Sequence, residues 1–282
     1  MPDAFLDPRA VRDVVDMALR EDAPFGDLTS RVFVPEHAVA VAHLVAREPG
    51  VFSGALVFET AMTALGGTQC ELFVEDGDRF AAGDVLATVT GPARHVLQTE
   101  RVALNLVQRM CGIATLTAQF VAAVAGTKAR VVDTRKTTPG LRALERHAVR
   151  CGGGHNHRYS LSDAVMAKDN HLALVDDLTA AIRAAREQLP HTTHLEVEVD
   201  RIDQIEPVLA GGGDTIMLDN FALDDLRAGV ELVAGRALVE ASGGVDLTTI
   251  AEIAKTGVDV ISVGALTHSV SNLDLGLDVR LS

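Results

Sequence analysis

The sequence predicts an α/β fold: an incomplete parallel α/β barrel preceded by a smaller, sandwich-like α/β domain. Three observations predict it. A mostly β segment comes first, and apolar runs then alternate with stretches of helical period. The last three of these runs recur at roughly 22-residue spacing, the length of one β/α unit. A doubly wound open sheet is the alternative, but no GxGxxG motif follows the first strand of the series.

The first half of the chain contains both helical and strand patterns. Residues 8 to 20 are expected to form a helix that starts at Asp7 or Pro8. Residues 38 to 95 favour strands in VAVAHLVAR, CELFVEDGD and VLATVTG, with a short helix near ALVFETAMTAL. The pattern EDGDRFAAGDVLATV resembles a lipoyl or biotinyl carrier hairpin, but no lysine precedes Lys128 to carry such a cofactor.

A second helical pattern covers residues 98 to 125, with an expected break near Cys111-Gly112. The two predicted domains are therefore residues 1–112 and 113–282. Six β-rich runs follow in the second domain: ARVVD, DAVMAK, LEVEV, TIMLD, ALVEA and DVISVG. Helical stretches between them include DDLTAAIRAAREQL, RIDQIEPVLA and LTTIAEIAKTG.

The composition excludes several classes of function. The net charge is −14, and a single tyrosine with no tryptophan leaves few aromatic platforms, so neither property favours a nucleic-acid partner. Cys70, Cys111 and Cys151 form no metal-type spacing. No signal-length apolar stretch opens the chain and no run of about 18 apolar residues occurs, so we expect a soluble cytoplasmic protein without a membrane partner.

Polar residues follow every apolar run of the predicted barrel. In parallel barrels the active site forms at the carboxyl ends of the strands, so these residues are the candidates. They are Thr134-Arg135-Lys136, Lys168-Asp169-Asn170-His171, Asp200, Asp219-Asn220, Ser242-Gly243-Gly244 and Gly264-Ala265.

Cations gather between residues 135 and 158, against a single acid, in an otherwise acidic chain. Arg135, Lys136, Arg158 and Lys168 lie at strand ends or in a glycine-rich loop, where guanidinium and ammonium groups would bind a carboxylate or phosphate. A second set recurs every fourth residue and is read as a solvated or subunit-facing helix stripe: Arg142, Arg146 and Arg150.

Thr138 and Pro139 are predicted to start a helix that runs to Arg150. The positive end of its dipole would then reinforce Arg135 and Lys136 at the same anion.

The acids alternate along LEVEVD, so Glu196 and Glu198 are expected on one face of their strand. Asp219 ends the next strand and would lie beside Glu198. The pair could hold ribose hydroxyls, share a hydrated Mg²⁺ or steady a developing positive charge, or it could simply be neutralised by nearby lysines.

Small residues end the last two strands. Ser242-Gly243-Gly244 and Gly264-Ala265 fall in the final loops of the barrel, where backbone N–H groups commonly surround a phosphate. Turn chemistry alone would also explain glycines here, but the two loops together favour a phosphorylated substrate.

These motifs resemble one family. ERVALNLVQRMCGIATLT, DTRKTTPGLRALERHAVRCGGGHNHR, KDNH, EVEVD, LDNF, ASGG and VGALTHS are similar to quinolinate phosphoribosyltransferases. The resemblance covers nearly the whole chain in order and is most specific from Glu100 to His171. Three positions depart from the family pattern: Ser160 for the usual Gly, Ala167 for Ile and His147 for Tyr. None of them removes a charged group that the chemistry would use.

The resemblance implies that quinolinate and phosphoribosyl pyrophosphate react, with Mg²⁺, to give nicotinate mononucleotide, pyrophosphate and CO₂ in NAD synthesis. It implies a homodimer, or a larger assembly, with sites at the subunit interface and Arg101 reaching the site of the partner. It also implies a role for each remaining candidate. Lys136, Lys168, Glu198 and Asp219 would be catalytic, the last two also near the metal; Arg135, His157 and Arg158 would bind substrate; and Ser242, Gly243, Gly244, Gly264 and Ala265 would bind the 5′-phosphate.

Other activities remain open at this point. A related phosphoribosyltransferase could use another pyridine or pyrimidine carboxylate, and a non-catalytic homologue could bind the same ligands. Lys136 and Lys168 at strand ends would also suit a Schiff-base aldolase. The His155-Asn156-His157 spacing would suit a metal-dependent hydrolase, although Arg158 beside it would repel a divalent ion.

Overall fold

The computed structural model describes residues 6–281, which form two compact units. Residues 1–5, part of the N-terminal stretch searched for a signal segment, lie outside the described residues. Unit 1 comprises residues up to 118 together with 137–153 and the C-terminal segment from 266. Unit 2 comprises residues 119–136 and 154–265. These units are discontinuous in sequence, whereas the division predicted at residue 112 was linear; that division stays a prediction.

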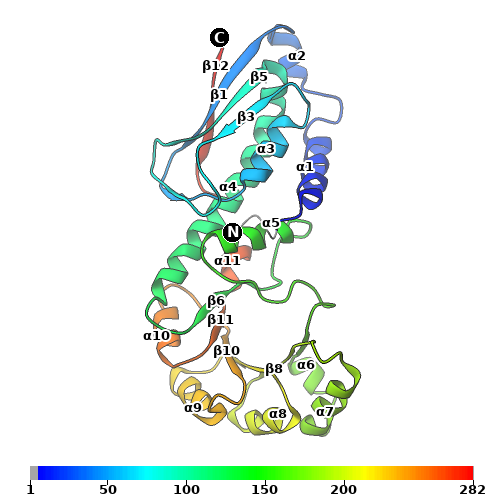
Figure 1. Ribbon diagram of the computed structural model, residues 1–282, viewed down its shortest axis with the longest axis vertical. Helices are drawn as coiled ribbons and strands as arrows, with labels where there is room; N and C mark the ends of the chain where they lie inside the picture. Colours follow the sequence, from blue (N-terminus) through cyan, green and yellow to red (C-terminus); the bar gives the residue numbers. More distant parts are fainter. Residues whose placement is uncertain (1–5, 282) are drawn as a thin grey trace. The chain divides into compact units, whose positions relative to one another are not determined.

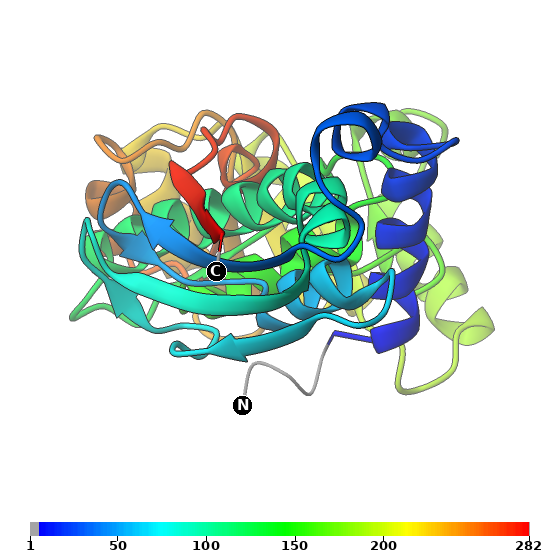
Figure 2. The same cartoon turned by 90° about the horizontal axis from the view of Figure 1, so that it is seen from above.

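Unit 1 contains an antiparallel sheet with the strand order β12-β1-β5-β3 and a short β2-β4 pair. The last strand, β12, pairs with β1 from Ala40↔Leu281 to Ala46↔Leu275. Figure 2 shows β12, in red, lying beside β1. The elements of unit 1 are α1 (Pro8–Asp22), α2 (Leu28–Phe33), β1 (Val39–Ala46), β2 (Gly50–Val51), α3 (Ala55–Thr63), β3 (Gln69–Leu72), β4 (Arg79–Phe80), β5 (Val85–Pro92), α4 (Ala93–Ala123, whose last residues belong to unit 2), α5 (Arg142–Cys151), α11 (Ala265–His268, whose first residue belongs to unit 2) and β12 (Leu275–Leu281).

Helix α1 starts where the sequence predicts. The side chain of Asp7 accepts the backbone N–H of Arg9, and Pro8 occupies the first helical position, where its missing N–H costs nothing. Its apolar face is buried in unit 1, whose core also includes Leu44, Phe52, Phe58, Met62 and Leu86.

Helix α4 runs without interruption through Cys111-Gly112, so the predicted break is wrong. Gly112 instead allows another segment to pack closely against the helix. A Cβ on Gly112 would come within 2.2 Å of the carbonyl oxygen of Ser271, so the missing side chain lets the C-terminal segment cross the helix closely.

By length and composition alone, α4 could also cross a membrane: it has 31 residues, and its most apolar window has a mean hydropathy of 1.2. Half of that window is buried inside the protein, as in an ordinary core helix. One such helix is weak support for a membrane span.

Helix α5 begins at Arg142, not at Pro139, and Thr138 is not its cap. Thr138 and Leu141 instead close a turn through a backbone hydrogen bond of 3.0 Å, with Gly140 at a φ of 84°. The N–H of Thr138 donates to the carboxylate of Glu145, a buried acid in the first turn of α5, which already complements the helix dipole. The proposed helix contribution to the anion site is therefore not supported.

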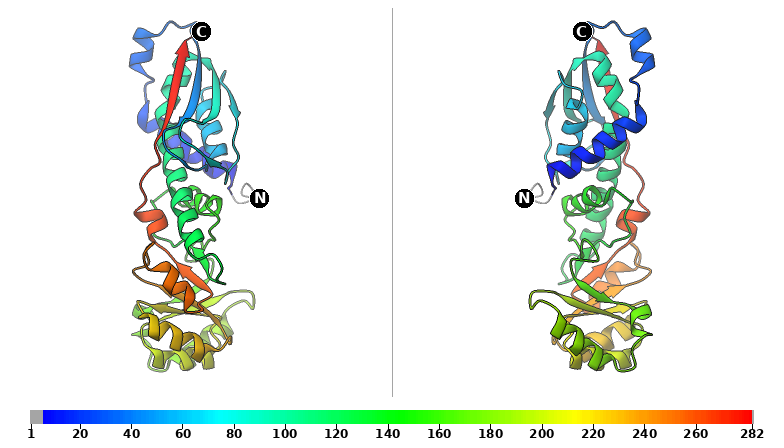
Figure 3. Two further views of the ribbon diagram at one scale, coloured as in Figure 1. Left: turned by 90° about the vertical axis from the view of Figure 1, so that its left-hand side faces the viewer. Right: turned by 90° about the vertical axis from the view of Figure 1, so that its right-hand side faces the viewer.

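Unit 2 contains a six-stranded parallel sheet in the order β6-β11-β10-β9-β8-β7 (Figure 1). Helices α7 to α10 pack against one another in chain order, and α8 and α9 cover one face of the sheet (Figure 3). This arrangement confirms the predicted incomplete α/β barrel. The elements of unit 2 are β6 (Arg130–Val132), β7 (Val165–Ala167), α6 (Asp169–Leu172), α7 (Leu178–Gln188), β8 (Leu195–Val199), the 3₁₀ turn η2 (Ile202–Gln204), α8 (Ile205–Gly211), β9 (Thr215–Asp219), α9 (Leu223–Val233), β10 (Leu238–Ser242), α10 (Ile250–Lys255) and β11 (Val260–Ser262).

The two faces of this sheet carry different side chains, because neighbours along a strand point to opposite faces. One set is apolar and fully buried, as expected beneath helices: Val197, Val199, Ile216, Leu218, Val239 and Ile261. The strand register places the acids together on the other face. The paired positions are Glu196↔Thr215, Glu198↔Met217↔Glu240 and Asp219↔Ser242. The predicted sharing of a face by Glu196 and Glu198 follows from this register.

Candidate active site

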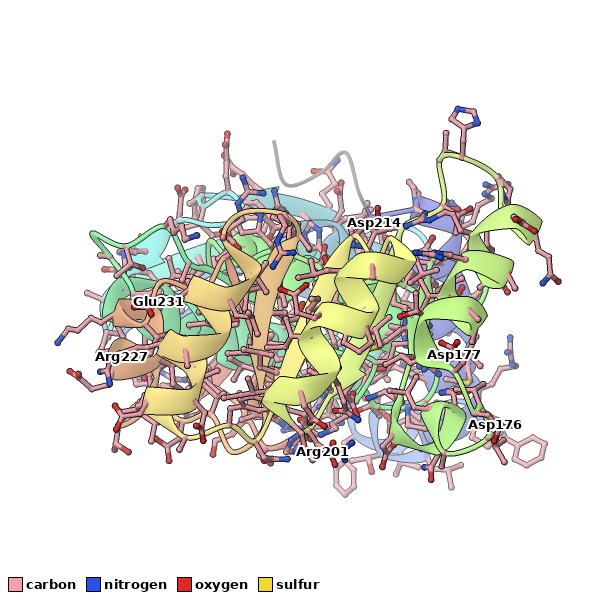
Figure 4. All side chains as sticks on the ribbon, turned by 90° about the horizontal axis from the view of Figure 1, so that it is seen from below. Asp176, Asp177, Arg201, Asp214, Arg227 and Glu231 are labelled. Atoms are coloured by element: carbon pink, nitrogen blue, oxygen red, sulfur yellow. The ribbon has the colours of Figure 1, made fainter. Side chains whose placement is uncertain are left out.

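All predicted site residues except Arg101 belong to unit 2. Most of them lie in the last residues of its parallel strands or directly after them, whereas His157 and Arg158 lie in the loop that follows α5. Figure 4 identifies the two ends of this sheet: Arg201, which follows β8, and Asp214, which precedes β9, are labelled at opposite ends of α8. The candidates lie at the Arg201 end. Because carboxyl ends of parallel strands share one edge, the structure brings these residues to one rim.

Lys168 and Glu198 form an ion pair between the ends of β7 and β8. The Glu198 side chain is 11 % exposed and that of Lys168 is 43 % exposed, so the acid is largely enclosed while the cation borders solvent. His171 accepts the N–H of Lys168 at 2.9 Å through Nδ1, which fixes the turn that carries the lysine.

Asp219 and Ser242 are register partners at the ends of β9 and β10. Just beyond them, the N–H of Asn220 donates to the Ser242 carbonyl at 2.9 Å, and its Nδ2 donates to Asp219 Oδ2 at 2.7 Å. Glu198 and Asp219 are thus on neighbouring strands and on one face of the sheet, as predicted.

The glycine loop after β10 has a backbone that side chains rarely permit. Gly243 has a φ of 94° and Gly244 a φ of 59°. Successive N–H groups in such a loop can converge on an anion, which is the predicted use of this segment. Gly264 and Ala265 follow β11, the next strand in the sheet, where α11 begins.

Arg135 and Arg158 lie close enough for their charges to interact. Burial lowers the pKa of Arg158, and the nearby Arg135 guanidinium lowers it further. Two cations facing one space are stabilised by an anion between them. Lys136 is exposed beside them, and its N–H donates to Thr134 Oγ1 in a local turn.

His157 is held from the interior by two buried glutamates. Its Nε2 lies 3.0 Å from Glu196 Oε2 and 3.6 Å from Glu240 Oε2. Burial by itself would lower the pKa of His157, but the hydrogen bonds to Glu196 and Glu240 outweigh it and raise this pKa to about 10. Burial also raises the pKa of Glu240, and the adjacent Glu196 adds to this shift.

The other ring nitrogen of His157, Nδ1, forms a hydrogen bond of its own. Nδ1 lies 2.8 Å from the N–H of Arg158, a contact that fits an unprotonated nitrogen. In this geometry the ring proton lies on Nε2, directed at the glutamates. Charging the ring, which the raised pKa favours, would place a second proton on Nδ1 and break its contact with the Arg158 N–H.

Asp133 ties the loop of His157 to strand β6, a role that the sequence reasoning missed. This fully buried carboxylate accepts the N–H of His157 at 2.8 Å and Nδ2 of Asn156 at 2.6 Å. The backbone of His155 forms an isolated parallel bridge with Val132. The signal was present, because Asp133 directly precedes the candidate segment Thr134-Arg135-Lys136.

Glu240 was also missed, although ALVEAS repeats the alternation of LEVEVD and the sheet register aligns Glu240 with Glu198. The alternative of a metal-dependent hydrolase relied on the pair His155 and His157. In the described part of the chain, His157 belongs to a group of side chains that could hold an ion, with Glu196 and Glu240, and His155 does not.

Arg101 lies on α4 in unit 1, where it is exposed. A single chain cannot test its predicted action on a partner subunit, so that role stays a prediction.

A cavity of about 540 Å³ opens beyond β8 and β9, next to Asn220. Its charged lining consists of Asp200, Arg201, Asp203 and Asp225. Arg201 forms ion pairs with Asp200 and Asp203.

Sequence comparison matches both parts of the chain to known domains. Residues 27–111 match the quinolinate phosphoribosyl transferase N-terminal domain and residues 113–278 match the C-terminal domain of the same family. The chain belongs to the quinolinate phosphoribosyltransferase family. A relative from Mycobacterium leprae, named nicotinate-nucleotide pyrophosphorylase [carboxylating], is 46 % identical over 277 residues, covering 96 % of this chain and 97 % of the relative.

Other quinolinate phosphoribosyltransferase relatives agree. A probable nicotinate-nucleotide pyrophosphorylase [carboxylating] of Bacillus subtilis is 43 % identical and covers 93 % of this chain and 91 % of its own. The crystal structure of NadC from Streptococcus pyogenes superimposes with a TM-score of 0.94 at 40 % identity, over 98 % of this chain and 99 % of that one. Human nicotinic acid phosphoribosyltransferase shares the fold alone, with a TM-score of 0.57, 16 % identity and coverage of 90 % and 72 %.

Proposed function

We propose that this enzyme transfers the phosphoribosyl group of phosphoribosyl pyrophosphate to quinolinate and releases pyrophosphate and CO₂, forming nicotinate mononucleotide for NAD synthesis. The observation that carries the proposal is the single rim of the parallel sheet. Arg135 and Lys136, the Lys168–Glu198 pair, Asp219 and a glycine loop all lie at or just beyond the carboxyl ends of strands at that rim. Few substrates need all four features, and this pair of substrates does.

Quinolinate has two carboxylates on adjacent ring carbons, and the cation group suits them. Arg135 and Arg158 interact unfavourably with each other, so an anion between them is favoured. His157 is next to Arg158 in the chain, and Glu196 and Glu240 hold its ring in place. We assign these three residues to quinolinate, with Lys136 exposed beside them for either substrate.

Loss of pyrophosphate builds positive charge on the ribose, and Glu198 and Asp219 would stabilise it. Lys168 neutralises Glu198 before substrate arrives and can turn to a substrate anion afterwards. Once the ring nitrogen bears the ribose it becomes an electron sink, so the bond to the neighbouring carboxylate can break. CO₂ leaves, the electron pair stays on the ring carbon, and that carbon takes a proton from water. Binding and orientation then account for catalysis, and no covalent protein intermediate is needed.

Mg²⁺ fits the same acids. Glu198 and Asp219 offer carboxylate oxygens from adjacent strands, which is the donor type that Mg²⁺ prefers. These residues would hold it together with substrate phosphates, and the ion would supply charge neutralisation for the departing pyrophosphate. The positive-φ backbone of Gly243 and Gly244, with Ser242, Gly264 and Ala265, would bind the 5′-phosphate.

We further propose a homodimer, or a larger assembly built from it, located in the cytoplasm. The exposed position of Arg101 on α4 suits a residue that completes the site of a partner subunit. Mixing an Arg101→Ala subunit with a Lys168→Ala subunit tests this directly. Partial recovery of activity is expected if one residue acts across the interface, and no recovery would contradict it.

The Schiff-base alternative is less consistent with the site. Lys168 is ion-paired with Glu198, and an ion-paired ammonium is not a nucleophile. Borohydride with a keto substrate should therefore leave the enzyme active.

Purified protein supplied with phosphoribosyl pyrophosphate, Mg²⁺ and either quinolinate or nicotinate tests the assignment. We expect mononucleotide formation with quinolinate and little with nicotinate, because the second carboxylate is needed to occupy the cation group. Equal turnover of nicotinate would contradict the carboxylating assignment and favour a related phosphoribosyltransferase.

A further inference from the structure

Asn220 has an unusual backbone. It directly follows β9, and its φ of 58° lies in the left-handed region. Among the described residues other than glycine, only Ala234 shares a positive φ. A side chain in this region costs free energy, so its surroundings must maintain the conformation. Asparagine tolerates it better than most residues.

The conformation lets Asn220 bond to both neighbouring strand ends. Its N–H reaches the Ser242 carbonyl at 2.9 Å, which continues the β9–β10 ladder by one residue. Its Nδ2 turns back to Asp219 and donates to Oδ2 at 2.7 Å. One residue therefore holds the backbone before the glycine loop and one oxygen of the Asp219 carboxylate.

The side chain of Asn220 also fills the space beside Gly243. A Cβ on Gly243 would lie 2.2 Å from Asn220 Oδ1 and 2.9 Å from its backbone nitrogen. The Asn220 amide thus occupies the space that a side chain at Gly243 would need, so position 243 does not accept a larger residue while Asn220 is present.

We propose that Asn220 is a positioning residue that fixes the Asp219 carboxylate and the Ser242-Gly243-Gly244 loop relative to each other. The inference rests on the proposed function, in which these two groups bind the ribose and the 5′-phosphate of one substrate. Asn220 then sets the separation between two contacts on the same molecule. Quinolinate, bound by Arg135, Arg158 and His157, does not depend on it directly.

Two substitutions distinguish the contribution of the Asn220 backbone from that of its side chain. Asn220→Gly keeps the positive φ and removes both side-chain contacts. Asn220→Asp keeps the shape beside Gly243 but replaces the Nδ2 donor with an oxygen that repels Asp219. Each variant should lower kcat/KM for phosphoribosyl pyrophosphate about ten- to a hundredfold, as for the loss of a hydrogen bond to a charged group. The KM for quinolinate should change by about twofold or less.

A double substitution tests the contact with the glycine loop. Gly243→Ala alone should be severely impaired, because its Cβ meets the Asn220 amide. In the Asn220→Gly background the same alanine should cost less, since the clash with the amide is gone, although the strain of an alanine at this φ and the close backbone nitrogen of residue 220 remain. The two effects are therefore expected to be non-additive.

Ala234→Gly is the matched control. It changes the other non-glycine residue with positive φ, at the C-terminal end of α9, before β10 begins and so at the opposite end of the strands from the rim, and should leave both KM values unchanged. Circular dichroism and thermal denaturation verify that each variant is folded.

The outcomes are distinct. Absence of activity in the unmodified enzyme would reject the proposed function itself. An active enzyme whose Asn220→Gly and Asn220→Asp variants keep normal kinetics would overturn the positioning role alone. Equal loss for both substrates, in proportion to unfolded protein, would also overturn it, because Asn220 would then act only through folding.

Discussion

Glu198 is enclosed at the end of β8 and paired with Lys168 at the end of β7, so two neighbouring parallel strands deliver opposite charges to one point. The pair gives a largely buried carboxylate a counter-ion next to the expected ribose site. Substrate phosphates can attract Lys168 away, which would free Glu198 for the reacting sugar.

The first prediction concerns Glu198. Glu198→Gln should lower kcat about a hundredfold or more, since it removes a charge that stabilises the transition state. The protein should remain folded, because Lys168 borders solvent and can be hydrated. Steady-state kinetics measure the effect, and Glu187→Gln, an exposed change on α7, serves as the control. Near-normal turnover in Glu198→Gln would remove this residue from the chemistry.

Arg158 and Lys136 give a second prediction. Arg158→Ala should raise the KM for quinolinate about a hundredfold, because a fork of charge-assisted hydrogen bonds to a carboxylate is lost. Lys136→Ala should also greatly weaken quinolinate use. Arg183→Ala, which removes an exposed arginine bonded to the Ala210 carbonyl, should leave kinetics unchanged. Normal quinolinate kinetics in Arg158→Ala or Lys136→Ala would mean that the anion site is elsewhere.

His157 gives a prediction for pH. With a pKa raised from 6.5 to about 10, its charge stabilises the fold fully below pH 6.5, and this contribution is lost as pH rises toward 10. Glu240→Gln removes one of the carboxylates responsible, so the pKa of His157 should fall. NMR titration of the ring measures it, and Glu252→Gln, an exposed change on α10, is the control. A His157 pKa near 6.5 in the unmodified protein would contradict this account.

Arg109 gives a prediction for stability in unit 1. Its guanidinium binds Glu145 Oε1 at 2.7 Å, Thr138 Oγ1 at 3.0 Å and the Thr267 carbonyl at 2.7 Å. Arg109→Met would strand the buried Glu145 carboxylate and lower the free energy of unfolding by about 3 kcal/mol.

Urea denaturation measures this loss. Arg47→Met, which breaks an exposed pair with Asp278, should barely move the denaturation midpoint. Equal midpoints for the two variants would show that the Arg109 cluster is not a stabilising contact.

Much of the fold was predictable because its signals are local. The alternation in LEVEV and the polar residues after each strand predicted both the barrel and its rim. Strand β12 was missed because it pairs with β1, a segment more than 200 residues earlier in the chain, and no local sequence pattern indicates such a pairing. The break expected at Gly112 was wrong for a related reason. Gly112 makes room for Ser271, which is distant in sequence, and it does not interrupt its own helix.

The site was predictable at the strand ends and less so behind them. The rim acids and cations stand out because they follow apolar runs. Glu240 contacts the ring of His157, and Asp133 accepts its backbone N–H. Only the strand register and the path of the loop reveal these two contacts. The start of α5 was misplaced because Thr138 and Pro139 form a turn before the helix. The N–H of Thr138 donates to Glu145, seven residues further along the chain, and the sequence pattern of Thr-Pro does not show this contact.

The most direct test is the stoichiometry of the reaction. With quinolinate labelled at the carboxylate next to the ring nitrogen, phosphoribosyl pyrophosphate and Mg²⁺, the enzyme should release one CO₂ and one pyrophosphate for each nicotinate mononucleotide formed. No CO₂ should appear without phosphoribosyl pyrophosphate. Mononucleotide formation without CO₂, or CO₂ release without the cosubstrate, would contradict the account.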